Sequence, residues 1–224
     1  CRHNRSYLRG FLKYLFLNRK ITKRDLSALV MGPVNFANLN PPKFFTPEEI
    51  KKIFSIPTTY AARELRCMAM VHLAYSLGLR PKEIAMICLD DVCFAKREIC
   101  IAQRKSLNPI TLPLPEAAVK AIAAYVIGAR PKTDLRALFV TLFVPFRPLT
   151  PASVSHDITL HIQKVNPNAT GYWLRHTYAQ NMLESDASIF EIKQMMGHDS
   201  LDTTRKYLFI HTKLMRKVLF DETI

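Results

Sequence analysis

Long apolar runs are missing from this sequence. The longest one extends only from Ala137 to Phe146 and ends against Arg147, whereas a helix needs roughly 20 apolar residues to cross a bilayer. We therefore expect no membrane span. The chain also begins without a methionine, and its basic, amphipathic start has no cleavage-site pattern. These features predict a piece of a longer protein that carries no secretory signal.

Paired cysteine motifs are absent as well. The sequence has 5 cysteines, Cys1, Cys67, Cys88, Cys93 and Cys100, and none of them forms a C-x-x-C pair. Disulfide frameworks and zinc knuckles need spacings that this chain lacks. We expect reduced, mostly buried thiols in a cytosolic protein, and a metal site built from the last three cysteines is disfavoured.

Two catalytic signatures are also lacking. No G-x-x-x-x-G-K-[ST] run is present, which argues against a nucleotide-driven motor. His156 and His161 are five residues apart, a spacing that places them on different faces of a helix. A metal-dependent nuclease is therefore disfavoured.

Acidic residues are scarce relative to basic ones. Lys and Arg total 32 against 18 Asp and Glu, so the net charge is +14 and the sequence pI is about 9.8. This excess is typical of proteins that bind nucleic acid. Ribosomal and membrane-surface proteins are equally basic, so the charge indicates the sign of the partner and leaves its identity open.

The apolar spacing and the turn residues predict two domains. Apolar side chains recur at helical spacing over residues 6–18, and glycine, proline and asparagine then accumulate before Phe44. We place the end of a first helical domain at residues 1–30, a linker at 31–43 and a second domain at 44–224. Thr46, Pro47 and Glu49 form a helix-start signal, with threonine at the N-cap, proline at N1 and glutamate at N3.

The second domain is predicted to be mainly α with one small antiparallel β-sheet. A helix from about Tyr60 ends at Gly78, Pro81 begins a short helix, and alternating isoleucines over residues 92–113 predict a hairpin. Residues 139–146 are predicted to form a short strand or a buried connection. Further helices are expected over residues 115–128, 150–164, 172–184, 188–196, 200–209 and 212–220.

Five side chains of this domain match the needs of phosphodiester chemistry. Arg80 and Arg175 offer planar cations that fit nonbridging phosphate oxygens, and His198 could add a donor near neutral pH. Lys105, at the predicted hairpin tip, could protonate a leaving 5′ oxygen, and Tyr207 could act as a covalent nucleophile. Each residue taken alone has an ordinary alternative, such as a solvated arginine, a turn lysine, a capping histidine or a half-buried tyrosine.

The joint order of these residues resembles the tyrosine recombinase (phage integrase) family. The matching segments are Gly78-Leu79-Arg80-Pro81-Lys82-Glu83-Ile84, Leu174-Arg175-His176-Thr177, Gly197-His198 and Tyr207. The resemblance implies a mostly helical catalytic domain with a small sheet, preceded by a helical core-binding domain, the two closing around DNA. Residues 1–30 resemble the end of that first domain.

The same resemblance assigns roles to the matching positions. It implies that Arg80 and Arg175 bind phosphate, that Lys105 is the hairpin lysine, and that Tyr207 forms a 3′-phosphotyrosyl link. His198 corresponds to the histidine of the third motif. We prefer Lys105 to its neighbour Arg104, because an arginine does not readily give up a proton at neutral pH.

Three further positions lie close to these motifs. Glu83 and His176 resemble supporting positions that orient the arginines and His198, a role that ordinary structural hydrogen bonds would also fill. Family members usually carry histidine three residues before the second arginine, and this chain has Tyr172 there. Tyrosine, with a pKa of about 10, is a poor general base at neutral pH, so slower cleavage or water acting as the base is expected.

The resemblance implies a site-specific DNA recombinase or integrase that needs no metal and no nucleotide cofactor. Its partner would be double-stranded DNA, on which dimers to tetramers assemble at paired sites, in the cytoplasm. The alternative is a catalytically impaired, DNA-binding relative with an architectural or regulatory role, which Tyr172 favours and the other matching residues oppose. A basic RNA-binding or ribosomal protein would explain the charge but not the order of the motifs.

Overall fold

The computed structural model describes residues 2–18, 24–30, 42–57, 61–102 and 109–197. The chain divides into two compact units, Cys1–Asn40 and Pro41–Ile224. The predicted limits of the first domain, the linker and the catalytic domain stay predictions, because residues 31–41 lie outside the described part. The helices predicted at residues 200–209 and 212–220 lie outside it too.

The first unit contains one helix and one short turn of helix. The predicted helix is confirmed as α1 (Arg2–Leu17), which begins a few residues earlier than expected, and η1 (Ser27–Leu29) follows it. Arg9 joins the two, since its Nε donates to the carbonyl of Val30 at 2.8 Å. Tyr7 and Phe11 of α1 are more than half exposed.

The second unit begins with the predicted helix start. In α2 (Pro47–Ser55) the hydroxyl of Thr46 accepts from the backbone of Glu49 at 3.2 Å, and the Glu49 carboxylate accepts from the backbone of Thr46 at 2.9 Å. This reciprocal pair satisfies two backbone donors that a helix start otherwise leaves free. Ile50 and Ile53 of α2 then face the core.

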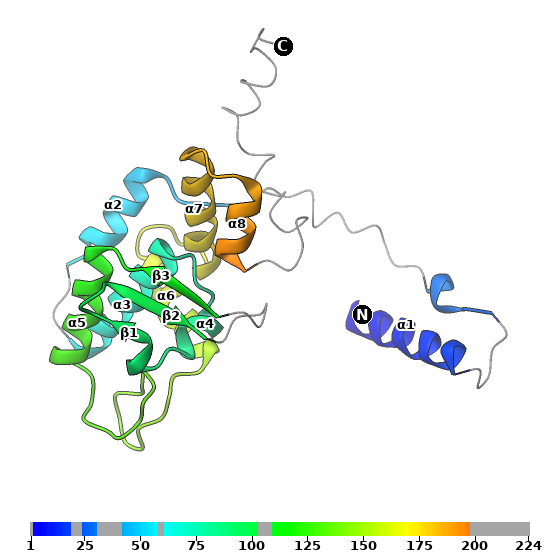
Figure 1. Cartoon of the computed structure of the whole chain (residues 1–224), viewed down its shortest axis with the longest axis horizontal. Coiled ribbons are helices and arrows are strands. Elements are labelled where there is room, and N and C mark those ends of the chain that lie inside the picture. The colour runs from blue at the N-terminus through cyan, green and yellow to red at the C-terminus, as the bar shows by residue number, and fades with distance from the viewer. Residues whose placement is uncertain (1, 19–23, 31–41, 58–60, 103–108, 198–224) are drawn as a thin grey trace, which may run out of the picture. The chain divides into compact units, whose positions relative to one another are not determined.

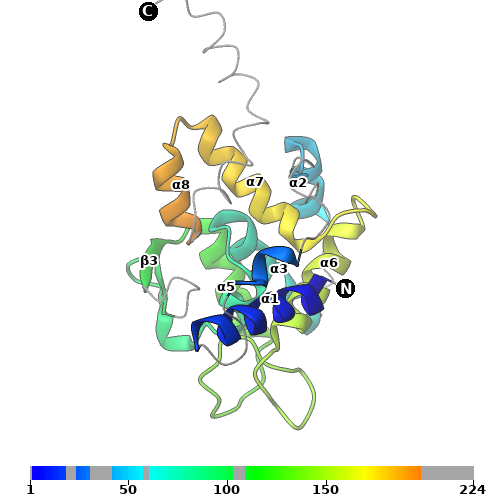
Figure 2. The same cartoon turned by 90° about the vertical axis from the view of Figure 1, so that its right-hand side faces the viewer.

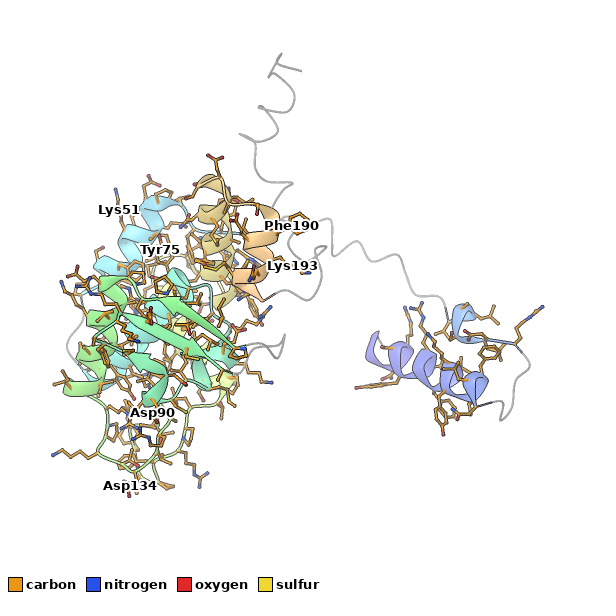
Figure 3. All side chains as sticks on the ribbon, in the orientation of Figure 1. Lys51, Tyr75, Asp90, Asp134, Phe190 and Lys193 are labelled. Carbon is orange, nitrogen blue, oxygen red and sulfur yellow. The ribbon has the colours of Figure 1, made fainter. Side chains whose placement is uncertain are left out.

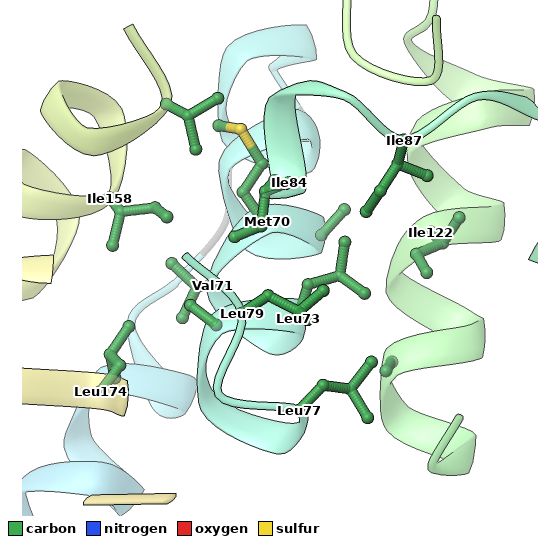
Figure 4. Packing of buried hydrophobic residues seen from close by; sticks show 14 of the residues in the cluster. Met70, Val71, Leu73, Leu77, Leu79, Ile84, Ile87, Ile122, Ile158 and Leu174 are labelled. Carbon is green, nitrogen blue, oxygen red and sulfur yellow. The ribbon is translucent and has the colours of Figure 1, made fainter. Parts of the chain in front are cut away.

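Helix α3 (Ala62–Ser76) is the centre of the main hydrophobic core. It packs against α5 (Glu116–Gly128), α6 (Pro151–Gln163) and α7 (Gly171–Glu184), while the short α4 (Pro81–Ala85) packs on α6. Figure 4 shows Met70, Val71 and Leu73 of α3 with Ile122 of α5 on one side and Ile158 and Leu174 of α6 and α7 on the other. Burial of such side chains supplies most of the driving force for folding.

A three-stranded antiparallel sheet confirms the predicted change of period. The strands β1 (Val92–Cys93), β2 (Glu98–Ile101) and β3 (Ile110–Pro113) follow the turn η3 (Leu89–Asp91) and lie in the order β1-β2-β3. Ile99 pairs with Leu112, and both are buried. The fold is therefore mainly α with one small sheet, as predicted, although the hairpin tip at residues 103–108 lies outside the described residues.

The cysteine expectation was wrong in part. Cys67 is buried in the core, and burial raises the pKa of its thiol to about 12. Cys93 is exposed, and Cys88 and Cys100 are only partly buried. Side chains alternate across a strand, so the isoleucines of β2 take the core face and leave Cys100 on the outer face.

The connection before α6 also differs from its prediction. Leu138 and Phe139 are fully buried, but Phe143 is 84% exposed and Val144 is 80% exposed, and no named strand forms there. Thr141 explains the reversal, because its backbone and hydroxyl both bond to the backbone of Arg147 and close a protruding turn. Only the first part of the apolar run thus belongs to the core.

The helical pair α7 and α8 (Ile189–Met196) lies at one end of the second unit, and the 130–148 connection lies at the opposite end (Figures 1 and 2). Asp134 marks that opposite end, and Phe190 and Lys193 project from α8 (Figure 3). Within the described residues, no helix has both the length and the apolar character that crossing a membrane requires.

Candidate active site

Arg80 stands at the start of α4, in the turn that follows α3. Gly78 makes this turn with a φ of +60°, a conformation that glycine adopts without steric cost. A side chain at Gly78 would also strike the ring of Tyr178, 2.4 Å from its nearest atom. The backbone N–H of Arg80 donates to Glu83 at 2.7 Å, so the residue that begins α4 is fixed by the third residue of the same helix.

Arg175 extends from the middle of α7 toward this turn. Its side chain is only 6% exposed. Arginines are rarely buried so deeply unless polar partners satisfy them. One Nη1–H donates to the carbonyl of Gly78, and Nη2 donates to the carbonyl of Met196 at 2.6 Å. The structure therefore brings the two predicted arginines, which are far apart in the sequence, to one place.

Glu83 lies between the two guanidinium groups and is 3% exposed. Its carboxylate is 2.8 Å from Nη1 of Arg80 and 3.9 Å from Nη1 of Arg175. Two like charges would repel in such a dry place, and a shared carboxylate offsets that repulsion. Glu83 thus has the orienting contacts expected of a supporting residue, although those contacts are also structural.

The C-terminus of α8 supplies the remaining acceptors. The Met196 carbonyl accepts from Nη1 of Arg80 at 3.3 Å as well as from Arg175, and the Gly197 carbonyl accepts from Nη2 of Arg80 at 3.1 Å. Helix C-termini carry partial negative charge and favour cations. Gly197 ends the helix in the left-handed conformation, with φ 59°.

This arrangement can bind an anion from its Arg80 side. The Arg80 side chain is 21% exposed and Arg175 is 6% exposed, so solvent and ligands reach Arg80 first. A phosphate would either accept hydrogen bonds from guanidinium N–H groups that the protein does not use or replace the α8 carbonyls as the acceptor. Either way the two cations are held together before any ligand arrives, which lowers the cost of ordering them on binding.

The other predicted residues fall into two groups. Tyr172 and His176 lie on α7; Tyr172 is 53% exposed and His176 is partly buried. Tyr172 precedes Arg175 by three residues, so the two share a face of the helix. His198, Tyr207 and Lys105, together with the alternative Arg104, lie outside the described residues.

The site depends on groups that the sequence reasoning missed. The carbonyls of Gly78, Met196 and Gly197 hold the arginines, and a backbone carbonyl has no residue-specific signal in a sequence. The only available signal was indirect, since both glycines follow a predicted helix, where a left-handed residue is common.

A second charged cluster was also missed. Arg66 of α3 donates to Asp157 at 2.8 Å and to the Val140 carbonyl at 2.7 Å, and Arg63 contacts the same carboxylate at 3.0 Å. This cluster borders a cavity of about 680 Å³. It joins α3, α6 and the 130–148 connection, and we assign it a structural role. Among the residues that the structure describes, no three His, Cys, Asp or Glu side chains gather as metal ligands would.

Comparison with known proteins places this arrangement in a family. The model of the phage integrase family matches residues 43–213. The tyrosine recombinase XerA of Pyrococcus horikoshii is 30% identical over 183 residues, which cover 80% of this chain and 60% of XerA. The tyrosine recombinase XerC of Bacillus subtilis is 25% identical over 217 residues, which cover 94% of this chain and 70% of XerC.

Solved structures share the fold at lower identity. A crystal structure of XerA recombinase matches with a TM-score of 0.65 and 20% identity, covering 96% of this chain and 81% of that one. The site-specific recombinase XerH bound to palindromic difH substrate matches with a TM-score of 0.69 and 18% identity, covering 84% of this chain and 55% of that one. The chain spans about 60% of the length of the Pyrococcus XerA. On the family match, which covers more than half of its residues, the chain belongs to the tyrosine recombinase (phage integrase) family.

Proposed function

We propose that this protein is a site-specific DNA recombinase or integrase that cuts and rejoins DNA strands through a covalent 3′-phosphotyrosine intermediate. The observation that carries the proposal is the joining of Arg80 and Arg175 through Glu83 at the end of α8. Paired guanidiniums fit the nonbridging oxygens of a phosphodiester. The segment that follows this end contains His198 and Tyr207.

The proposed reaction is a phosphoryl transfer in two balanced steps. The Tyr207 hydroxyl gives its proton to water and its oxygen attacks phosphorus. The bond from phosphorus to the 5′ oxygen breaks, and Lys105 protonates the leaving 5′ oxygen. Arg80, Arg175 and His198 stabilise the added negative charge of the transition state, and loss of one such donor typically costs about a hundredfold in rate. A free 5′ hydroxyl then gives its proton to Lys105 and attacks the phosphotyrosine, and the leaving Tyr207 oxygen takes a proton back from water. The covalent link conserves the bond energy, so no nucleotide or metal cofactor is required.

Double-stranded DNA is the proposed partner. The net charge of +14 agrees with it, and the relative XerH was crystallised on its difH substrate. We further propose that dimers to tetramers assemble on paired DNA sites and that the protein acts on cytoplasmic DNA. Binding should weaken steeply with salt, because phosphate contacts release counterions.

The test is a nicked suicide substrate that traps the covalent intermediate. We expect the wild-type protein to form a covalent protein–DNA adduct, and Tyr207→Phe to form none while its DNA affinity stays within a few fold. Tyr178→Phe is the matched control, because it also removes one tyrosine hydroxyl and keeps the ring that packs on Gly78.

The outcomes separate the candidate functions. Adduct formed by Tyr207→Phe but lost in Tyr178→Phe would move the nucleophile to α7. Specific DNA binding without any adduct from the wild-type protein would favour the alternative, a catalytically impaired DNA-binding relative, to which Tyr172 in place of histidine points.

A further inference from the structure

The segment that leads into α2 is fastened to α7. Residues 42–46, here called the strap, belong to no helix or strand, yet Phe45 of the strap is only 2% exposed. Its backbone N–H donates to Oγ1 of Thr177 at 2.9 Å in a buried hydrogen bond. The same hydroxyl donates to the carbonyl of Trp173 at 2.8 Å. Thr177 therefore links the strap to the backbone of α7.

Aromatic and polar contacts extend this attachment. The ring of Phe45 lies 5.4 Å from the ring of Trp173, and Nζ of Lys43 lies 5.7 Å from the same ring. Just past the strap, the carboxylate of Glu49 accepts from Nδ2 of Asn166 at 2.9 Å. The chain from Lys43 to Glu49 thus holds both α7 and the connection that leads into it.

The strap and the arginine site grip opposite faces of α7. Trp173 and Thr177 are four residues apart and share one face of the helix, whereas Arg175 is two residues from each, about 200° around the axis. On that far face, Arg175 bonds to Gly78 and Met196. A shift of α7 toward or away from the strap would therefore change how far the Arg175 guanidinium reaches.

The two halves of α7 pack in different hydrophobic clusters. Leu174 belongs to the main core, whereas Ala179 and Leu183 of the second half form a separate small cluster with Ile192 and Met196 of α8. Because α8 packs on the second half of α7, a shift of α7 would also displace the Met196 carbonyl. By holding α7, the strap therefore affects the positions of both Arg175 and the Met196 carbonyl that accepts from it.

We propose, resting on the recombinase function above, that Thr177 is a positioning residue: through its buried bond to the strap it sets the place of α7 and so the alignment of Arg175 and Tyr172 for DNA cleavage. Among the described residues, its hydroxyl bonds to the backbone of Phe45 and of Trp173, so it acts through the position of α7. Its loss should lower the rate of the chemical step and leave the affinity for DNA nearly unchanged, because few charged contacts are altered.

The experiment compares Thr177→Val with Thr177→Ser. Valine keeps the shape and removes the hydroxyl, whereas serine keeps the hydroxyl. In single-turnover cleavage of the suicide substrate at saturating DNA, we expect the valine variant to be slower by about tenfold to a hundredfold, as small misplacements of catalytic groups typically cause. We expect the serine variant to recover most of that rate. Both should bind DNA within a few fold of wild type.

Two further measurements separate positioning from loss of stability. Trp173 is the only tryptophan of the chain, so its fluorescence reports the strap junction directly, and it should change in the valine variant and not in the serine variant. Thr150→Val is the matched control, because Thr150 caps α6 by accepting from Ser153 at 3.1 Å and has no part in the strap. It should cleave at the wild-type rate.

If Thr177→Val does not fold, Phe45→Leu removes the ring contact with Trp173 and should give the same slow cleavage.

The results distinguish failure of this inference from failure of the proposed function. Wild-type cleavage rates in Thr177→Val or in Phe45→Leu would overturn the positioning role, as would a serine variant as slow as the valine variant. Absence of adduct from the wild-type protein would instead overturn the recombinase function, and the positioning role with it.

Discussion

Replacing Glu83 with glutamine would test the electrostatic account of the arginine pair. The carboxylate is 2.8 Å from Arg80 and 3.9 Å from Arg175, and its side chain is 3% exposed. Glutamine keeps the volume and one acceptor oxygen, but it removes the negative charge that both guanidiniums share. The variant therefore isolates charge from packing.

The expected loss of stability follows from burial. A unit charge pair near 4 Å is worth roughly 4 kcal/mol at an effective dielectric constant near 20, and removing one partner of a buried pair typically costs about 3 to 5 kcal/mol. Arg80 is partly solvated, and the α8 carbonyls still accept from both arginines. We therefore expect Glu83→Gln to lower the free energy of unfolding by about 3 kcal/mol, near the lower end of that range.

The assay is urea denaturation of both the variant and a matched control. Glu116→Gln also removes one carboxylate, from a pair with Lys120 at 2.6 Å whose side chains are 62% and 75% exposed. Exposed pairs of this kind contribute little to stability, because solvent screens them. If Glu83→Gln costs no more than Glu116→Gln, the shared carboxylate does not hold the arginines together, and the reasoning is wrong.

Three further predictions concern other parts of the second unit. Gly197→Ala should lower the free energy of unfolding by about 1 to 2 kcal/mol and slow adduct formation, because a β-carbon is strained at φ 59°. Asparagine tolerates that conformation, so Gly197→Asn should recover most of the stability and most of the rate. Urea denaturation and the suicide-substrate assay measure the two effects. Burial lowers the pKa of His72 to about 4, so the unfolded chain takes up the proton first and stability should fall between pH 6.5 and 4, by at most about 3 kcal/mol. The melting temperature of His72→Phe should therefore depend less on pH across this range than that of the wild-type protein. An unchanged pH dependence would refute the role of His72. Tyr172→His should speed single-turnover cleavage by about tenfold or more, since imidazole is the better base near pH 7, and an equal or slower rate would show that Tyr172 is not limiting.

The local signals in the sequence were sufficient where the physics is local. The Thr46 and Glu49 capping pair, the turn at Gly78 and the isoleucine alternation of β2 each depend on neighbouring residues, and the structure has all three where they were expected. The prediction from the apolar run after Ala137 was wrong for the opposite reason. Whether Phe143 is buried depends on the turn that Thr141 closes with Arg147, and hydrophobicity alone carries no such information.

The sequence by itself determined the family, the mainly helical fold and the identity of the charged residues, because motif order, helix period and charge can be read along one chain. Only the tertiary structure decided that Arg80, Glu83 and Arg175 share one site and that the carbonyls at the end of α8 complete it. The same is true of the strap on α7, which joins Phe45 to Thr177. Backbone acceptors are chemically the same at every position, so only folding, which excludes water and brings distant segments together, makes particular ones matter.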